Sequence, residues 1–208
     1  MECRTWIAVL VKEPGSAKTR LAAALTPAER RSLAEECALR VLRTARGVAP
    51  TLAVCGGPEA ERLAASAGVE AVVEDEQRGQ NPAGARGLEA VAVRGAPACL
   101  LLSADLPLVD AEGLRRLLAR ADAEPAPVAV AVPALGRTGT NALYLRPVGG
   151  FALQFGDRSL PRFAAEARRA GRRFAVHDEP SLALDLDEPD DLVTLAGIRD
   201  CSASGLHP

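Results

Sequence analysis

The chain has 208 residues, of which 48% are hydrophobic, 25% are charged and only 3% are aromatic. This composition excludes a disordered chain, and the length suits one domain with a sizeable core. The formal net charge of −2 excludes a general basic surface for nucleic acid or membranes, so local clusters of positive charge need their own explanation. Residues 1–13 lack the regions of a signal peptide and no apolar run could span a bilayer, so we expect a cytoplasmic protein.

The five cysteines are scattered and include no Cys-x-x-Cys pair. This distribution argues against a disulfide framework and against a metal site built on thiolates. Three of the cysteines lie in apolar segments, where a free thiol behaves as a small hydrophobic side chain.

The first half of the chain alternates apolar runs with segments of helical spacing. Residues 6–11 are typical of a buried strand, and a polar loop follows over residues 12–19. Thr26 and Pro27 supply a cap and a first-turn proline for a helix over residues 27–46. Further strands are predicted at 51–55, 69–73, 98–102 and 128–132, and further helices at 58–67, 82–93 and 111–121. This alternation predicts right-handed crossovers and a parallel sheet.

The alternation weakens after Pro133. Short strands are predicted over residues 141–145, 174–177 and 182–184, with a helix over 159–170 among them, and we expect these strands to add a mixed or antiparallel edge. A last helix is predicted over 189–198, and residues 201–208 are expected to form a frayed, disordered tail. Because no repeat or linker is visible, residues 1–200 are predicted to form one α/β domain.

The loop after the first strand is the first candidate site. Lys12, Lys18 and Arg20 bring three positive charges to a place just ahead of a helix start. Ligands of open α/β sheets bind beyond the carboxyl ends of the strands, where this loop lies. Positive charge opposes the helix dipole at that end, and a bound phosphate would remove the conflict. The spacing of a Walker P-loop is absent, and a solvated basic loop stays an alternative.

Carboxylates in two separate segments are the second set of candidates. Asp105 follows the most apolar strand, and Asp185 and Asp187 would share one face of a late strand. Mg²⁺ takes carboxylate oxygens together with substrate phosphates, and a carboxylate at the end of a buried strand is costly without a partner. As alternatives, Asp105 could accept hydrogen bonds within a turn and Asp187 could cap the last helix. Asp190 and Asp191 are interpreted as residues that stabilise the start of that helix.

Small residues form the third candidate site, in the segments 137–144 and 155–159. Glycine and small hydroxyl side chains allow backbone amides to approach an anion closely. Ser159 precedes a helix, so capping is its simpler role, although the same position could place its hydroxyl on a phosphate or carboxylate.

Together these segments resemble the guanylyltransferases of coenzyme F420 biosynthesis, from residue 11 to about residue 195. That family activates a small phospho-acid with GTP: 2-phospho-L-lactate in archaea and phosphoenolpyruvate in many bacteria. The most specific matches are Gly-Thr-Asn-Ala-Leu at 139–143, Phe-Gly-x-x-Ser at 155–159 and Leu-Asp-Leu-Asp-x-Pro-x-Asp-Leu at 184–192. Residues 17–21 and 104–107 also fit, but related nucleotidyltransferases share them.

The resemblance implies a Rossmann-like, nucleotide-diphospho-sugar transferase (GT-A-like) fold, with a mostly parallel sheet covered by helices on both faces and usually in a homodimer. It implies that Mg²⁺ is held by Asp105, Asp185 and Asp187, and the phospho-acid by Thr140, Gly156 and Ser159. Lys12, Lys18 and Arg20 would face the triphosphate, so that Lys18, Arg20 and Asp105 would be catalytic. Asn81 would contact the nucleoside, although the usual Gly-Leu-Asn reads Gly-Gln-Asn here.

The reaction expected from this resemblance joins GTP to phosphoenolpyruvate and releases pyrophosphate, with hand-off of the product to a downstream F420 transferase. The chain is rich in arginine and alanine and poor in lysine, which favours the bacterial acceptor. 2-Phospho-L-lactate and 3-phosphoglycerate stay open as acceptors. The three acids differ only by a methylene, a methyl or the position of a hydroxyl, and one such group is worth only about 1–3 kcal/mol in an apolar pocket. A molybdopterin-type nucleotidyltransferase, a glycosyltransferase-like enzyme and a non-catalytic nucleotide-binding module also stay open as functions.

Overall fold

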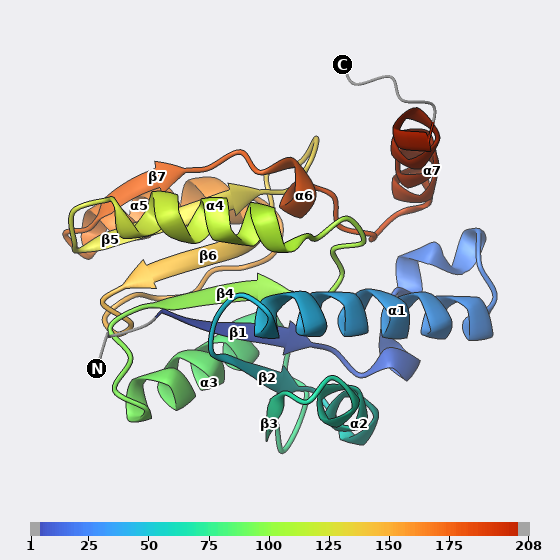
Figure 1. The fold of residues 1–208 in the computed structure, drawn as a ribbon, viewed down its shortest axis with the longest axis horizontal. Coiled ribbons are helices and arrows are strands. Elements are labelled where there is room, and N and C mark those ends of the chain that lie inside the picture. The colour runs from blue at the N-terminus through green and yellow to red at the C-terminus, as the bar shows by residue number, and fades with distance from the viewer. Residues whose placement is uncertain (1–4, 204–208) are drawn as a thin grey trace.

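The apolar runs of the sequence form a single seven-stranded sheet in the computed structural model, which describes residues 5–203 (Figure 1). The strands are β1 (Trp6–Val11), β2 (Thr51–Cys55), β3 (Glu70–Val73), β4 (Cys99–Ser103), β5 (Val128–Pro133), β6 (Thr140–Arg146) and β7 (Arg173–Val176). Their order is β3-β2-β1-β4-β6-β5-β7, so β4 lies at the centre. Strands β1 to β4 are parallel to one another, as the alternating sequence predicts.

The antiparallel strand lies inside the sheet rather than at its edge. Strand β6 pairs antiparallel with both β4 and β5, and β7 pairs parallel with β5. The expected mixed or antiparallel edge is therefore confirmed in part: β6, β5 and β7 form a mixed half of the sheet, but the antiparallel strand β6 lies inside the sheet rather than at its edge. The connection from β5 to β6, residues 134–139, contains no helix, and so short a link can join only antiparallel strands.

Helices cover both faces of the sheet (Figure 1). Helices α1 (Pro27–Arg46), α2 (Pro58–Ser66), α4 (Ala111–Asp122) and the short α6 (Pro180–Ala183) pack on one face, and α3 (Gln80–Val93) and α5 (Ser159–Arg169) on the other. Successive residues of β1 alternate between the two buried clusters, which is why this strand is apolar throughout. The predicted α/β fold, with a mostly parallel sheet and helices on both faces, is thus confirmed.

Two predictions for the end of the chain need correction. Residues 182–184 do not form a strand, because Pro180 and the side chain of Glu179, which accepts from Ser181 N, start the helical turn α6. Helix α7 (Pro189–Ala203) runs beyond residue 198, so the start of the predicted tail is helical, and residues 204–208 lie outside the described part. Within residues 5–203, no helix is long and apolar enough to cross a membrane.

Three cysteines are buried free thiols, namely Cys37, Cys55 and Cys99. Burial raises the pKa of Cys55 and Cys99 to about 12, so both stay protonated at neutral pH. They act as small hydrophobic side chains, as their apolar surroundings predict.

Candidate functional site

A cavity of about 690 Å³ opens beyond the carboxyl ends of β1 and β4, where an open α/β sheet places its ligands. Seven of the predicted site residues line this cavity: Lys12, Arg20, Asp105, Thr140, Gly156, Asp185 and Asp187. Residues that are about 175 positions apart in the sequence thus share one cavity, because the strand ends bring their loops together. Lys18, Asn81 and Ser159 do not line it.

The carboxylates of Asp185 and Asp187 reach the cavity from an extended segment, residues 184–188, which we call the acid loop. Leu184 and Leu186 are buried in a cluster with α1 and α7, whereas Asp185 and Asp187 lie on the cavity wall. The alternation resembles that of a strand, although the acid loop belongs to no strand. The N–H of Leu186 donates to the carbonyl of Asp105 at 3.2 Å, which fixes the acid loop beside the end of β4.

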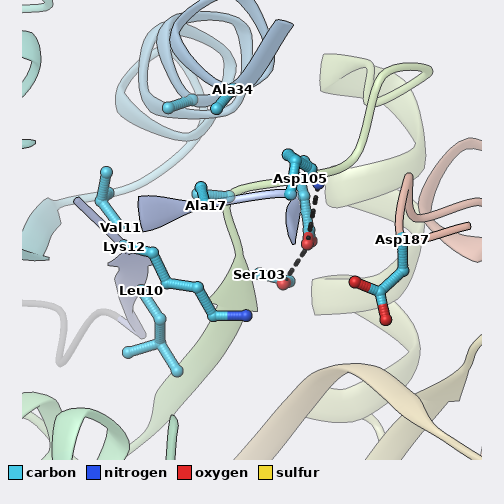
Figure 2. A pocket seen from close by; sticks show the side chains of 11 residues that line it. Leu10, Val11, Lys12, Ala17, Ala34, Ser103, Asp105 and Asp187 are labelled. Atoms are coloured by element: carbon cyan, nitrogen blue, oxygen red, sulfur yellow. Dashed lines mark hydrogen bonds and ion pairs between the residues drawn. The ribbon is translucent and has the colours of Figure 1, made fainter. Parts of the chain in front are cut away.

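Asp105 is held by two side chains. Ser103 Oγ donates to Asp105 Oδ1 at 2.6 Å, and Lys18 Nζ lies 3.2 Å from Asp105 Oδ2. Burial alone would raise the pKa of Asp105, but the positive charges of Lys18 and Lys12 outweigh it and lower the pKa to about 2. Figure 2 shows Lys12 and Asp187 on opposite sides of Ser103 and Asp105. Asp105 therefore carries its negative charge at any physiological pH.

Lys18 does not line this cavity but a smaller adjoining pocket, which shares Lys12, Ser103, Asp105 and Asp187 with it. Its side chain is only 5% exposed, and its ammonium also donates to the carbonyl of Leu186 at 2.5 Å. The residue adopts a left-handed conformation with φ 60° just before a 3₁₀ helix, residues Thr19–Ala23. Such a conformation is uncommon outside glycine, and here it coincides with the two contacts that join Lys18 to Asp105 and the acid loop.

The other two predicted carboxylate ligands are also paired with basic side chains. Arg20 Nη1 lies 2.6 Å from Asp187 Oδ2, and Arg137 Nη1 lies 3.5 Å from Asp185 Oδ2. The pairing of Asp187 with Arg20 turns its carboxylate toward the cavity. Each of the three carboxylates thus has one basic partner that is distant from it in the sequence: Lys18 and Arg20 come from the loop after β1, and Arg137 comes from the loop before β6.

Arg137 and Asp191 form a second tie beside the cavity. Arg137 Nη2 lies 2.6 Å from both carboxylate oxygens of Asp191. Asp191 Oδ2 in turn accepts from the backbone N–H groups of Asp187 and Glu188, both at 2.7 Å. Asp191 therefore does stabilise the start of α7, as predicted, and it also clamps the acid loop. The sequence placed Arg137 in the candidate segment 137–144 but indicated no role for it, because its partners lie 48 and 54 residues away.

The donor set fits a divalent cation chemically, although it is not assembled as a ready cage. Burial, and after it the negative charge of Asp105, raises the pKa of Asp185 to about 6, so negative charge is concentrated where a cation would relieve it. Among residues 5–203, however, no three acidic, histidine or cysteine side chains stand close enough together to hold a metal. All three carboxylates line the cavity, each beside a basic partner.

Thr140 and Gly156 line the cavity, and Ser159 lies directly behind them. Ser159 Oγ donates to Thr140 Oγ1 at 3.0 Å, and the Ser159 side chain is fully buried. The capping role is wrong, because the N-cap of α5 is Arg158 and Ser159 is the first residue inside the helix. Gly156 has a φ of 114°, a conformation that favours glycine, and its carbonyl accepts from Ser159 N at 3.1 Å. Two of the three residues predicted to bind one ligand therefore line the cavity, and the third, Ser159, holds the Thr140 side chain from behind.

Asn81 binds protein backbone rather than lining the cavity. Its Oδ1 accepts from Phe155 N at 2.6 Å, and its Nδ2 donates to Phe155 O at 3.3 Å. These contacts tie the start of α3 to the segment that ends in Gly156. The preceding residue, Gln80, lines the cavity instead. No signal in the sequence separates the two neighbours, because both are amides in the same turn.

The chain matches a known protein family over most of its length. Residues 5–198 match the family model described as "Guanylyl transferase CofC like". Proteins named phosphoenolpyruvate guanylyltransferase from Conexibacter woesei and Rubrobacter xylanophilus are 37% and 38% identical, over 92% and 90% of this chain and 86% and 91% of their own. A 3-phospho-D-glycerate guanylyltransferase from Phenylobacterium zucineum is 36% identical over 86% of this chain and 84% of its own. A 2-phospho-L-lactate guanylyltransferase from Methanothermobacter thermautotrophicus is 33% identical over 85% of this chain and 77% of its own.

Solved structures share the fold at lower sequence identity. A protein of the nucleotide-diphospho-sugar transferase type from Desulfovibrio desulfuricans G20 superposes with a TM-score of 0.68 at 20% identity, over 96% of this chain and 95% of its own. CMP:2-keto-3-deoxy-manno-octonic acid synthetase, solved with CTP, gives 0.56 at 16% identity, over 97% and 100%. At these identities the likeness supports the fold alone.

Proposed function

Because this chain belongs to the CofC-like guanylyltransferase family of coenzyme F420 biosynthesis, we propose that it condenses GTP with phosphoenolpyruvate, giving enolpyruvoyl-2-diphospho-5′-guanosine and pyrophosphate. The observation that carries the proposal is the single cavity in which three carboxylates, three basic side chains and the Thr140–Gly156 wall meet. That combination suits two anionic substrates and the divalent cation that such enzymes use.

The reaction is an in-line displacement at phosphorus. A phosphate oxygen of phosphoenolpyruvate forms a bond to the α-phosphorus of GTP, while the bond from that phosphorus to the oxygen of the β-phosphate breaks and pyrophosphate leaves. The attacking oxygen is already ionised at neutral pH, so no general base is required. The protein then contributes alignment of the two phosphates and neutralisation of their charge.

Each wall of the cavity has a part in this scheme. Lys12 and Arg20, which line the cavity, bind the triphosphate and the leaving pyrophosphate. Thr140 and Gly156 bind the phospho-acid, with Ser159 holding the Thr140 hydroxyl from behind.

Asp105, Asp185 and Asp187 would hold Mg²⁺, which when bound supplies charge neutralisation and orientation of the phosphates. Lys18 positions Asp105 and the acid loop. Its buried ammonium supports the charge of Asp105 rather than reaching across the cavity to a phosphate.

Phosphoenolpyruvate is proposed over other acceptors because the relatives that carry its name reach 37–38% identity over nine tenths of this chain. 3-Phospho-D-glycerate and 2-phospho-L-lactate are the alternative acceptors, because other relatives are named for these acids. A cytoplasmic location, a homodimer and hand-off to a downstream F420 transferase stay predictions.

The test is pyrophosphate release from GTP and Mg²⁺ in the presence of each of the three phospho-acids in turn. We expect release with phosphoenolpyruvate at a kcat/KM well above that with 3-phosphoglycerate or 2-phospho-L-lactate. ATP and CTP in place of GTP test the base preference in the same assay. Faster release with another phospho-acid would replace the acceptor and keep the reaction. No release with any acid, from folded protein, would reject the reaction itself.

A further inference from the structure

Arg137 occupies a position that the proposed reaction does not use. Its guanidinium lines the cavity, lies 3.5 Å from Asp185 and makes two contacts of 2.6 Å with Asp191. Thr140, on the phospho-acid wall, follows three residues later in the chain. Arg137 therefore contacts a carboxylate proposed for the cation and lies in the loop that leads to the wall proposed for the acceptor.

The three basic partners of the carboxylates differ in their freedom to move. The Lys18 side chain is 5% exposed and is enclosed between Asp105 and the carbonyl of Leu186. The side chains of Arg137 and Arg20 are 29% and 66% exposed, and both face the cavity. The arginines can change partners by rotating their side chains, whereas Lys18 is buried and held by two partners, Asp105 and the carbonyl of Leu186.

A divalent cation and an arginine compete for the same carboxylate oxygens. A cation on Asp185 would repel the guanidinium of Arg137 and neutralise one of the two carboxylates that attract it, so that only the contacts with Asp191 would still hold it. A guanidinium displaced into a cavity that holds phosphates or a carboxylate has strong alternative partners there, with which it forms paired hydrogen bonds.

Resting on the function proposed above, we infer that Arg137 is an exchangeable counter-ion: it neutralises Asp185 until a divalent cation binds, and it then binds the anionic substrate. Arg20 makes the corresponding exchange from Asp187 to the triphosphate. The two arginines weaken binding of the cation on its own and strengthen binding of the cation together with nucleotide or phospho-acid. Cation and substrate are thus coupled, and by linkage each raises the affinity for the other.

The exchange leaves the acid loop in place. Asp191 keeps its two hydrogen bonds from the N–H groups of Asp187 and Glu188 when Arg137 moves, because those bonds do not involve the guanidinium. A variant that lacks the Arg137 charge should therefore retain the geometry of the loop. This separates the inference from a purely structural role for Arg137.

The experiment measures Mn²⁺ binding by titration calorimetry, without nucleotide and then with saturating GTP, for the wild type and for Arg137→Gln. Without nucleotide, Arg137→Gln should bind Mn²⁺ about fivefold more tightly, the size expected for loss of one partly exposed competing ion pair. With Mn²⁺ present, the same variant should bind phosphoenolpyruvate and GTP more weakly. A substitution that raises the affinity for the cation and lowers the affinity for the substrate is expected only of a counter-ion that changes partners.

Three further variants complete the design. Arg20→Gln should also tighten Mn²⁺ binding without nucleotide. Arg137→Lys keeps the positive charge but loses the paired hydrogen bonds, so it should keep the wild-type affinity for Mn²⁺ and bind the anionic substrate more weakly. Arg62→Gln removes an arginine on α2 whose side chain is 70% exposed, and it serves as the matched control. It should change neither the affinity for Mn²⁺ nor the affinity for GTP and phosphoenolpyruvate. Weaker or unchanged Mn²⁺ binding by folded Arg137→Gln would overturn the inference and leave the proposed function standing. If the wild type bound no Mn²⁺ even with GTP, the metal assignment would fail and the inference with it.

Discussion

Lys18 and Asp105 are 87 residues apart in the sequence and form an ion pair, 3.2 Å from Nζ to Oδ2, beside the cavity that Asp105 lines. The same ammonium donates to the carbonyl of Leu186. One side chain thus joins the loop after β1, the loop after β4 and the acid loop. The positions of the carboxylates on the cavity wall depend on this junction.

Lys18→Met should lower the free energy of unfolding by about 2–3 kcal/mol, because it leaves Asp105 partly buried without its partner. Asp105 is 22% exposed, which places the cost below that of a fully buried pair. Urea denaturation of the two proteins measures the difference. In a double-mutant cycle with Asp105→Asn, the two changes together should cost about 1–3 kcal/mol less than their sum. Strict additivity would show that the pair contributes no coupling.

Asp105→Asn should lower kcat by at least about a hundredfold while the protein stays folded, since the substitution keeps the shape of the side chain and removes the charge proposed to hold the cation. Pyrophosphate release measures kcat, and circular dichroism checks the fold. Asp178→Asn is the matched control, because it neutralises an exposed aspartate outside the cavity. Activity of Asp105→Asn close to that of the control would show that this carboxylate has no part in the chemistry.

Asn81→Ala should raise the KM for the phospho-acid about three- to tenfold. Asn81 makes two hydrogen bonds to the backbone of Phe155, which precedes Gly156 on the wall proposed for the phospho-acid. The ratio of kcat/KM values for GTP and ATP should stay unchanged. Asn81→Asp keeps the acceptor for Phe155 N and should give an intermediate KM. A loss of base selectivity with an unchanged KM for the acid would instead support a contact between Asn81 and the nucleoside, as the family resemblance implies.

Glu166 should make the stability of the protein depend on pH in acid. Hydrogen bonds from Arg169 and from Ala152 N lower the pKa of Glu166 to about 2, from an ordinary value of 4.5. A lowered pKa stabilises the fold above pH 4.5, and this contribution is lost as the pH falls from 4.5 toward 2. The free energy of unfolding of Glu166→Gln should therefore fall less steeply over that range. An unchanged slope, with Glu89→Gln as an exposed control, would show that Glu166 is not the group responsible.

The fold could be predicted from the sequence as far as local patterns reach. The apolar run before Lys12 and the capping residue Thr26 place β1 and α1 almost to the residue, because both signals lie within a few positions of the element. The place of β6 between β4 and β5 could not be predicted in this way, because strand order depends on pairing between distant segments. The turn at Pro180 was missed because a short apolar run is ambiguous between helix and strand.

The candidate site shows the same division. Asp105 was predicted because a carboxylate after a central apolar strand needs a partner, and the structure does place it on the cavity wall beside Asp185 and Asp187. The partners themselves were not predictable. The pairing of Arg137 with Asp185 and Asp191 depends on how a hairpin loop meets a segment about 50 residues later, which no local pattern records.

The most direct test of the proposed guanylyl transfer follows an oxygen label. The protein is incubated with GTP, Mg²⁺ and phosphoenolpyruvate whose phosphate oxygens are ¹⁸O, and the products are examined by mass spectrometry and phosphorus NMR. Attack of that phosphate on the α-phosphorus predicts a guanosine product that carries all of the label and pyrophosphate that carries none. Label in the pyrophosphate, or consumption of GTP without a labelled guanosine product, would contradict the account.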